Sequence, residues 1–287
     1  MAIDYQKLKN WCFDDIDQKY TIKDTMLYAL GLGIGQNPID EDQLRYTYEA
    51  GLHALPTLAV VLGYPGFWLK QPGTGVDWTK VLHGEQGLVI HRPLPVEGHV
   101  IGRTRVIEII DKGPDKGALV LTGRDIMDAK TQELLCSLTS TTYCRADGGF
   151  GGPEVRAAVP SAVPNTPPEL NFDWQTAPGQ ALIYRLNGDF NPLHADPKIA
   201  AAGGFPKPIL HGLATYGIAG YAILRMFCGN DAARLKRLDV RFSSPVYPGE
   251  LLRTESWRTG EGQAAFRVLS VDRDLVVLNN GRAEFTT

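Results

Sequence analysis

The residues best suited to chemistry lie in one turn-rich stretch, residues 184–212, with the sequence YRLNGDFNPLHADPKIAAAGGFPKPILHG. An acid, Asp189, and a base, His194, stand five residues apart in it, with Asn191 and Pro192 between them. Pro192 fixes its own φ and biases Asn191 toward an extended conformation, which stiffens the loop where the two side chains must face each other. A carboxylate and an imidazole held in this way can share a water molecule, because one accepts its proton while the other orients it or supplies a proton.

The same composition also has a purely structural interpretation. Asp-x-Asn-Pro is common in turns, and a histidine after a turn is usually a surface or capping residue. Gly212 favours the catalytic interpretation, since a glycine at the start of a buried helix presents a backbone N–H at the positive end of the helix dipole. That N–H could stabilise the charge of a thioester enolate, whereas the alternative role for Gly212 is close helix packing.

Other kinds of site find no support in the sequence. His53, His91 and His99 have no partner pattern and are interpreted as structural or surface residues. There is no zinc-type His/Glu motif, and GLGIG at residues 31–35 follows a helical pattern rather than a strand, so neither a metal nor a dinucleotide site is expected. No Gly-x-Ser-x-Gly of a serine hydrolase is present. With a net charge of −3 and no Lys/Arg run, nucleic acid is not an expected partner.

Composition predicts a globular protein of a reducing compartment. The four cysteines are scattered over 287 residues, which is no disulfide framework. The N-terminus lacks a signal-peptide core and the C-terminal AEFTT is not Ser-Lys-Leu, so a cytoplasmic location is expected, with a peroxisomal one open for a eukaryotic source. The longest uncharged run, between Lys207 and Arg225, is shorter than the ~20 apolar residues of a membrane span, so no membrane partner is expected.

Hydrophobic patterns divide the chain into two similar halves, 1–145 and 171–287, joined by a linker at 146–170 that holds four glycines and five prolines. In the first half we predict a polar lead-in at 1–20, a helix at 21–35, a short strand at 44–48, an apolar segment at 56–63, and strands at 81–92, 98–110, 117–127 and 133–144. In the second half we predict a strand at 180–186, a helix at 212–228, and strands at 235–244, 250–258, 264–271 and 274–286.

The second helix, GLATYGIAGYAILRMFC, is apolar almost all the way round, which indicates burial on all sides. An antiparallel α+β arrangement, with a sheet curled around this helix, satisfies the pattern. The first half's apolar segment is interrupted by Pro56, Gly63 and Pro65, so its sheet should enclose less protein and leave room for something else.

Several motifs together resemble a known family. YRLNGDFNPLHADPKIA, with ILHG downstream, is similar to the hydratase 2 motif of the MaoC-like dehydratases. LHGEQ at 82–86, DKG at 111–113 and RFSSPVYPGE at 241–250 resemble the (R)-specific enoyl-CoA hydratase 2 domain of peroxisomal multifunctional enzyme type 2. One departure is Asn187, where the family usually has a small Ser or Thr.

The resemblance implies a double hot-dog fold, two antiparallel sheets each curled on a central helix, with the N-terminal helix shortened. It implies a hydro-lyase that reversibly adds water to a trans-2-enoyl-CoA to give the (3R)-3-hydroxyacyl-CoA, with no metal or redox cofactor, CoA being part of the substrate. Asp189 and His194 would be the acid/base pair, Asn191 would support the loop, and the N–H of Gly212 would bind the thioester oxygen.

Further contacts follow from the resemblance. His83 and Gly84 would line the acyl site, Lys112 would meet the anionic CoA moiety, and Phe242 would pack on the substrate. Alternatively, Lys112 is a solvated turn residue and Phe242 is a core residue. Lys116 could also do the electrostatic work proposed for Lys112. A homodimer is expected by family analogy, and the space left by the interrupted first helix predicts medium to long acyl chains. Two other functions stay open: a dehydratase acting on a steroid side-chain or branched-acid CoA thioester, and a non-catalytic acyl-CoA-binding hot-dog protein.

Overall fold

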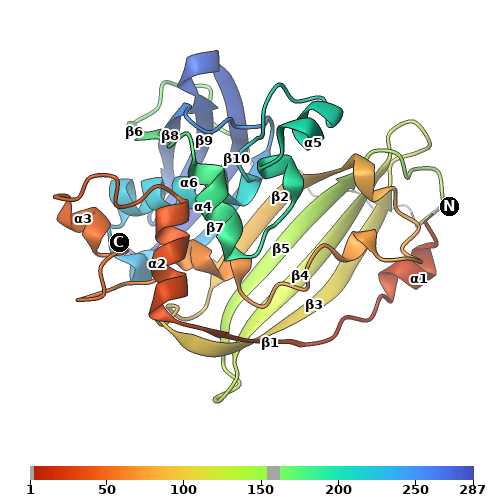
Figure 1. Ribbon diagram of the computed structural model, residues 1–287, viewed down its shortest axis with the longest axis horizontal. Coiled ribbons are helices and arrows are strands. Elements are labelled where there is room, and N and C mark those ends of the chain that lie inside the picture. Colours follow the sequence, from red (N-terminus) through yellow and green to blue (C-terminus); the bar gives the residue numbers. More distant parts are fainter. Residues whose placement is uncertain (1–2, 154–161) are drawn as a thin grey trace.

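The frame of the protein is a single antiparallel sheet of ten strands, seen here in a computed structural model that describes residues 3–153 and 162–287 (Figure 1). Its order is β1-β3-β4-β5-β2-β7-β10-β9-β8-β6. The strands are β1 (Ile16–Tyr20), β2 (Val81–Ile90), β3 (Gly98–Asp111), β4 (Ala118–Asp128), β5 (Leu134–Cys144), β6 (Leu170–Gln175), β7 (Leu235–Phe242), β8 (Leu251–Gly260), β9 (Gln263–Ser270) and β10 (Leu275–Phe285).

The two halves of the sheet have the same strand order. From the outer edge inward, the first half runs β1-β3-β4-β5-β2 and the second half runs β6-β8-β9-β10-β7. They meet where β2 pairs with β7, from Glu85↔Arg241 to Val89↔Arg237. The two predicted sheets are therefore one continuous sheet, because each half covers the exposed inner edge of the other.

Helix α6 (Gly212–Phe227) is the central helix predicted for the second half, and its residues from Ala214 to Leu224 are buried. Its small residues let neighbours approach. A Cβ on Gly217 would lie 2.6 Å from a methyl group of Leu32, and one on Gly220 would lie 2.7 Å from a methyl group of Thr57. The apolar circumference of α6 is thus packed on several sides, as its sequence predicts.

In the first half the central helix is reduced to η1 (Pro56–Val61), a single short 3₁₀ helix. Gly63 follows in a left-handed conformation with φ of 55°, and its backbone lies directly on that of Gly102 in β3. The chain then continues irregularly to β2 through η2 (Trp68–Lys70) and η3 (Trp78–Lys80). The predicted shortening of this helix is confirmed.

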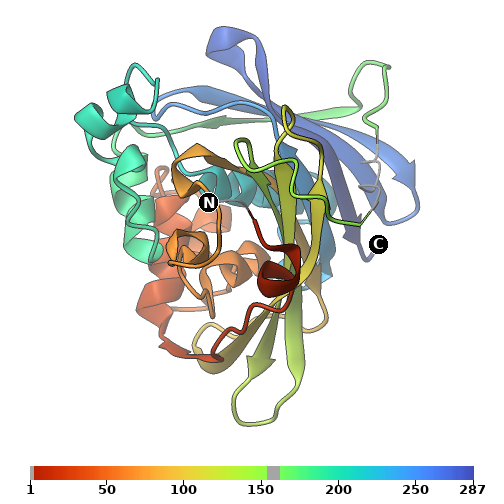
Figure 2. The same cartoon turned by 90° about the vertical axis from the view of Figure 1, so that its right-hand side faces the viewer.

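The remaining helices gather on the inner side of the curved sheet or at its ends (Figure 2). At the start of α2 the Thr21 N–H donates to the Asp24 carboxylate at 2.8 Å, and α2 packs against α4. These elements are α1 (Tyr5–Lys9), α2 (Ile22–Gly31), α3 (Glu41–Leu44), α4 (Gln180–Tyr184), η4 (Arg185–Asn187), η5 (Pro192–His194), α5 (Pro197–Ala202), η6 (Ala232–Arg234) and η7 (Val271–Arg273).

Three sequence predictions of local structure were wrong. The lead-in at 1–20 contains α1 and the edge strand β1, whose polar residues tolerate solvent at the sheet's margin. Residues 44–48 form no strand, since the chain turns after α3 to bury Tyr46, whose hydroxyl donates to the Asn230 carbonyl at 2.9 Å. Residues 180–186 are helical, because Ala181 and Tyr184 must share one buried face.

Of the predicted linker, residues 154–161 lie outside the described part, and the described residues from 146 to 169 form no helix or strand. Strand β6, which was not predicted, begins at Leu170, the last residue of the predicted linker. All four cysteines are free, three of them buried. Within residues 3–153 and 162–287, no helix has the length and apolar character needed to cross a membrane.

Candidate active site

The Asp189 loop is fixed by a succession of local hydrogen bonds. It begins at Gly188, which ends η4 in a left-handed conformation with φ of 107°. The Asp189 carboxylate then accepts the Asn191 N–H at 3.2 Å, and the Asn191 side chain accepts the Leu193 N–H at 3.1 Å. Pro192 opens η5, which ends at His194. The loop therefore has little freedom at the residues that carry its acid and base.

His194 is buried, with 8% of its surface exposed, and its position defines its tautomer. Its Nδ1 lies 2.9 Å from the carbonyl oxygen of Ile209. Since a carbonyl can only accept, Nδ1 carries the proton and Nε2 of the neutral ring is left as a proton acceptor. Burial lowers the pKa of His194, while the Ile209 carbonyl and the charge of Asp189 act in the opposite direction. The ring is therefore neutral near pH 7.

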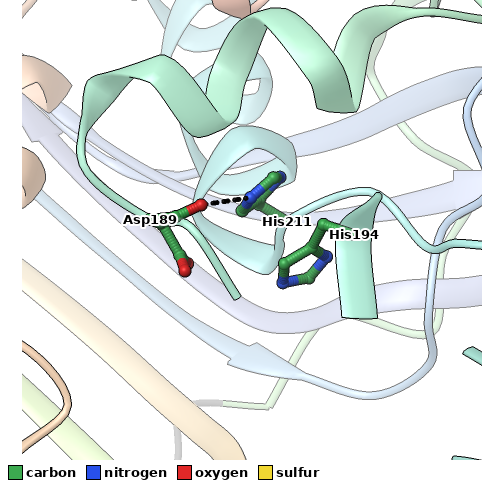
Figure 3. Close-up of side chains that lie close together, drawn as sticks. All are labelled: Asp189, His194 and His211. Atoms are coloured by element: carbon green, nitrogen blue, oxygen red, sulfur yellow. Dashed lines mark hydrogen bonds between the residues drawn. The ribbon is translucent and has the colours of Figure 1, made fainter. Parts of the chain in front are cut away.

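Asp189, His194 and His211 converge on one point, where the loop meets the start of α6 (Figure 3). One carboxylate oxygen of Asp189 and one ring nitrogen of each histidine all lie within 4.8 Å of one another. A single water forming two hydrogen bonds can span up to about 5.6 Å. Asp189 and His194 are thus close enough to hold one water between them.

His211 is a member of this cluster that the sequence did not reveal. Its ring stacks on that of His194 with centroids 3.7 Å apart, and its Nε2 donates to the backbone carbonyl of Asp189 at 3.2 Å. Burial, together with the neighbouring His194, lowers the pKa of His211 to about 4. His211 is therefore a neutral ring that supports both Asp189 and His194. Its place directly before Gly212 was the only available signal.

The three groups are poorly arranged for a metal ion. The two imidazole rings lie nearly parallel, with 25° between their planes, so lone pairs in the ring planes run side by side rather than toward a common centre. His194 Nδ1 and His211 Nε2 already serve backbone carbonyls. Coordination by both rings would require one of them to turn.

Gly212 and Phe242 complete the second half's contribution. Gly212 is the first residue of α6, and an N–H at that position has no acceptor within its own helix. The Phe242 ring packs over it, 3.1 Å from where a Cβ would stand. A donor with an unfilled bond therefore lies at the start of the buried helix, beside His211 and an aromatic wall.

His83 comes from the first half and meets Phe242 across the β2–β7 junction, with ring centroids 4.5 Å apart. Burial lowers the pKa of His83 to about 4, while its bond with the Glu85 carbonyl and the charge of Asp189 oppose this shift. Gly84 sits in an irregularity of the β2–β5 pairing, where a Cβ would lie 3.1 Å from the Thr141 carbonyl oxygen. The candidate site is thus built from both halves.

Lys112 is not part of this cluster. It is exposed, in the turn between β3 and β4. The register Asp111↔Ala118↔Cys144↔Val81 places that turn at the same end of the sheet as the start of β2, where His83 lies. Two pockets lie away from the site. One, of about 250 Å³, is lined by residues of 52–56, 90–96 and 231–233. The other, of about 200 Å³, is lined by residues of 36–43 and 174–175. The first pocket includes Ala54 and Pro56 of the interrupted apolar segment, but it lies by Ile90, at the opposite end of β2 from His83, so the predicted acyl slot stays a prediction.

Comparison with known proteins gives the same picture over both halves. Residues 18–146 match the MFE-2 hydratase 2 N-terminal domain, and residues 160–280 match the MaoC like domain. The chain is 39% identical over 276 residues to 3-hydroxyacyl-thioester dehydratase Y of Mycobacterium tuberculosis, covering 93% of each chain. It belongs to the MaoC-like dehydratase family.

Two further relatives support this membership. A peroxisomal enoyl-CoA hydratase 2 of Arabidopsis thaliana is 38% identical over 257 residues, which is 84% of this chain and 82% of the relative. The crystal structure of a MaoC-like dehydratase from Phytophthora capsici superposes with a TM-score of 0.88 at 33% identity, covering 99% of this chain and 98% of the other. The predicted α+β double hot-dog fold is confirmed.

Proposed function

We propose that this MaoC-like protein is a hydro-lyase that reversibly hydrates a trans-2-enoyl-CoA to the (3R)-3-hydroxyacyl-CoA. One observation carries the proposal. A carboxylate oxygen of Asp189 and a ring nitrogen of His194 lie within 4.8 Å of each other, beside the first N–H of α6. The names of the relatives, a 3-hydroxyacyl-thioester dehydratase and an enoyl-CoA hydratase 2, support the same reaction.

In the proposed reaction, one water donates to the Asp189 carboxylate and to Nε2 of His194, which directs its oxygen lone pair at C3. As the O–C3 bond forms and the C2=C3 double bond opens, one of the two acceptors takes a proton from the water. The same group then gives a proton to C2, so that both residues return to their starting protonation states. Neutral His194 suits this role, because the lowered pKa keeps Nε2 free to accept a proton at neutral pH and somewhat below.

The negative charge that develops on the thioester oxygen would be met by the N–H of Gly212. This donor has no competing acceptor inside its helix and lies at the positive end of the α6 dipole. A preorganised donor of this kind is worth roughly 10²–10³ in turnover. Together with the acid/base pair it supplies all the groups that the reaction requires, so no metal ion or redox cofactor is invoked.

The substrate would lie across the junction of the two halves. His83, Gly84 and Phe242 would line its acyl part, and Lys112 at the same end of the sheet would meet the phosphates of CoA. The acyl chain would continue along the inner face of the first half, where η1 replaces a full helix. Chains of medium to long length are therefore proposed as substrates.

The direct test is hydration of crotonyl-CoA and 2-decenoyl-CoA, followed by the loss of enoyl-thioester absorbance, with chiral analysis of the product. The expected result is turnover of both compounds to the (3R) product. Binding without turnover would identify a non-catalytic acyl-CoA-binding protein. Turnover of crotonyl-CoA alone would reject the assignment of chain length, and an (S) product would reject the assigned face of attack.

We also propose that the protein forms a homodimer. Three large apolar side chains on and beside α4, namely Leu182, Leu186 and Phe190, are more than half exposed. Apolar groups gathered in this way are typical of an interaction surface. Light scattering should give twice the mass of one chain, and a monomeric mass for the native protein would contradict the proposal.

A further inference from the structure

Arg124 of β4 is a charged side chain that the proposed reaction does not use. Its register partners place it on the inner face of the first half, where its Nη2 donates to the Val60 carbonyl at 2.7 Å and its guanidinium lies 5.2 Å from the centroid of the Tyr64 ring. Its Nε is buried and has no hydrogen-bond partner. Within the described part of the chain, Arg124 takes part in no ion pair.

A second unsatisfied group stands directly beside it. Thr104 of β3 is the cross-strand partner of Arg124, and its Oγ1 is also buried without a partner. An unpaired buried donor costs free energy, and an unpaired buried charge costs more. Two such donors side by side on the inner face of one half-sheet call for an acceptor from outside the chain, which is either an ordered water or a group of a ligand.

This place lies within reach of the candidate active site. Burial raises the pKa of Tyr64, with the charge of Asp189 acting in the same direction and that of Arg124 in the opposite one, so Tyr64 lies within the electrostatic range of both. The charge of Arg124 also acts on His83, where it contributes to the lowered pKa. On the sheet, Arg124 is level with Leu88 of β2, two strand spacings or about 10 Å away, and His83 lies five residues further along that strand.

We infer that Arg124 and Thr104 form a subsite for a carboxylate at the far end of the acyl chain, so that the preferred substrates are enoyl-CoA thioesters of dicarboxylic acids. The inference rests on the proposed function, because it takes the reacting carbons to lie at Asp189 and His194. A carboxylate matches the two donors in number and in charge, and guanidinium is the side-chain group best suited to binding it.

The bland alternative is that Arg124 only braces the segment that replaces the first helix, through Val60 and Tyr64. That structural role involves only Nη2 and the face of the guanidinium. It does not account for Nε and the Thr104 hydroxyl, which are buried without a hydrogen-bond partner. A brace would also affect all substrates alike. A carboxylate subsite affects only those substrates long enough to reach it and charged at the end.

The test compares kcat/KM for the eight-carbon mono-CoA thioester of trans-2-octenedioic acid with that for trans-2-octenoyl-CoA and for crotonyl-CoA. The proteins are the native chain, Arg124→Met, Thr104→Val, and Arg105→Met as the matched control. Arg105 lies on the neighbouring strand with its side chain 57% exposed, and its Nη1 bonds the Asp125 carboxylate at 2.6 Å. The same substitution there removes the same charge outside the proposed subsite.

The native protein should prefer the carboxylate-ended thioester. Arg124→Met should lower kcat/KM for it by roughly 10- to 100-fold, the value of a hydrogen-bonded charge, and should leave crotonyl-CoA within about threefold. Thr104→Val should lower it by a smaller factor, roughly threefold to tenfold, in the same direction. Arg105→Met should change none of the ratios.

Two results would overturn the inference. One is a native protein with no preference for the carboxylate-ended thioester, and the other is an equal loss on all three substrates in Arg124→Met. If Arg124→Met does not fold, the ratio measured with Thr104→Val decides. Failure of the proposed function is recognised separately, as no hydration of crotonyl-CoA by the native protein. In that case calorimetric binding of the two eight-carbon thioesters still tests the subsite.

Discussion

Lowering the pH from 7.5 to 5 should destabilise the folded protein, and His211 alone should account for about 2 kcal/mol of this loss. In the folded protein the pKa of His211 is lowered to about 4. In the unfolded chain the pKa of a histidine is about 6.5. At a pH between these two pKa values, the unfolded state binds more protons than the folded state. The free energy of unfolding therefore falls as the pH falls through this range.

The magnitude follows from the same two values. At pH 5, which is about 1.5 units below the pKa of the unfolded imidazole, the unfolded chain carries the proton while the folded ring is still mostly neutral. Each of these units lowers the free energy of unfolding by about 1.4 kcal/mol. The loss should therefore be about 2 kcal/mol at pH 5. It should stop growing below pH 4, where the folded ring is protonated too.

The assay is urea unfolding of the native protein and of His211→Gln at pH 7.5, 6 and 5. Glutamine can still donate to the Asp189 carbonyl but does not titrate. His83, whose pKa is also lowered to about 4, contributes equally in both proteins. The pKa of His194 is lowered as well, and its ring loses a stacked neighbour in the variant, so the difference between the two pH slopes reports the stacked pair of His211 and His194. Equal slopes in the native protein and the variant would refute a neutral, buried His211.

The remaining predictions concern catalysis and packing. Asp189→Asn and His194→Gln should each lower kcat by at least ~10²-fold with the melting temperature almost unchanged, and near-native turnover in either variant would remove that residue from the mechanism. Gly212→Pro removes the proposed oxyanion donor at a position where proline fits a helix start, and should lower kcat by roughly 10²-fold or more. Gly212→Ala is its control, because it keeps the N–H and only presses on the Phe242 ring, so equal losses in the two variants would reject the donor role. Gly217→Ala should destabilise by about 1–3 kcal/mol in thermal or urea unfolding, because its Cβ would meet Leu32 at 2.6 Å, and an unchanged free energy of unfolding would show that the contact is loose.

Local signals in the sequence were sufficient where the structure is locally determined. Pro192 stiffens the loop before His194, where the structure has η5, and the uniform apolarity of residues 212–228 predicts α6. Eight of the ten strands lie where alternation predicted them, since each has one face on the core and one toward solvent. The two missed strands, β1 and β6, lie at the margins of the sheet, where burial leaves a weaker pattern.

Features that depend on distant contacts were not predictable in this way. His211 acquires its position through a bond to a residue 22 places earlier and a stack on His194, and neither leaves a local pattern. The alternation in residues 180–186 was misleading, because the helix α4 packs on α2 through few residues. The pairing of β2 with β7 is equally invisible, since any two inner strands carry similar residues.

The union of the two half-sheets through β2 and β7 has a practical consequence at low protein concentration. His83 on one side of that junction and Phe242 on the other belong to the same polypeptide, so dilution cannot separate them. Even if a homodimer comes apart, each released chain keeps a complete set of the groups assigned to turnover. Specific activity should therefore stay constant down to nanomolar enzyme, in contrast to an enzyme whose active site is shared between subunits.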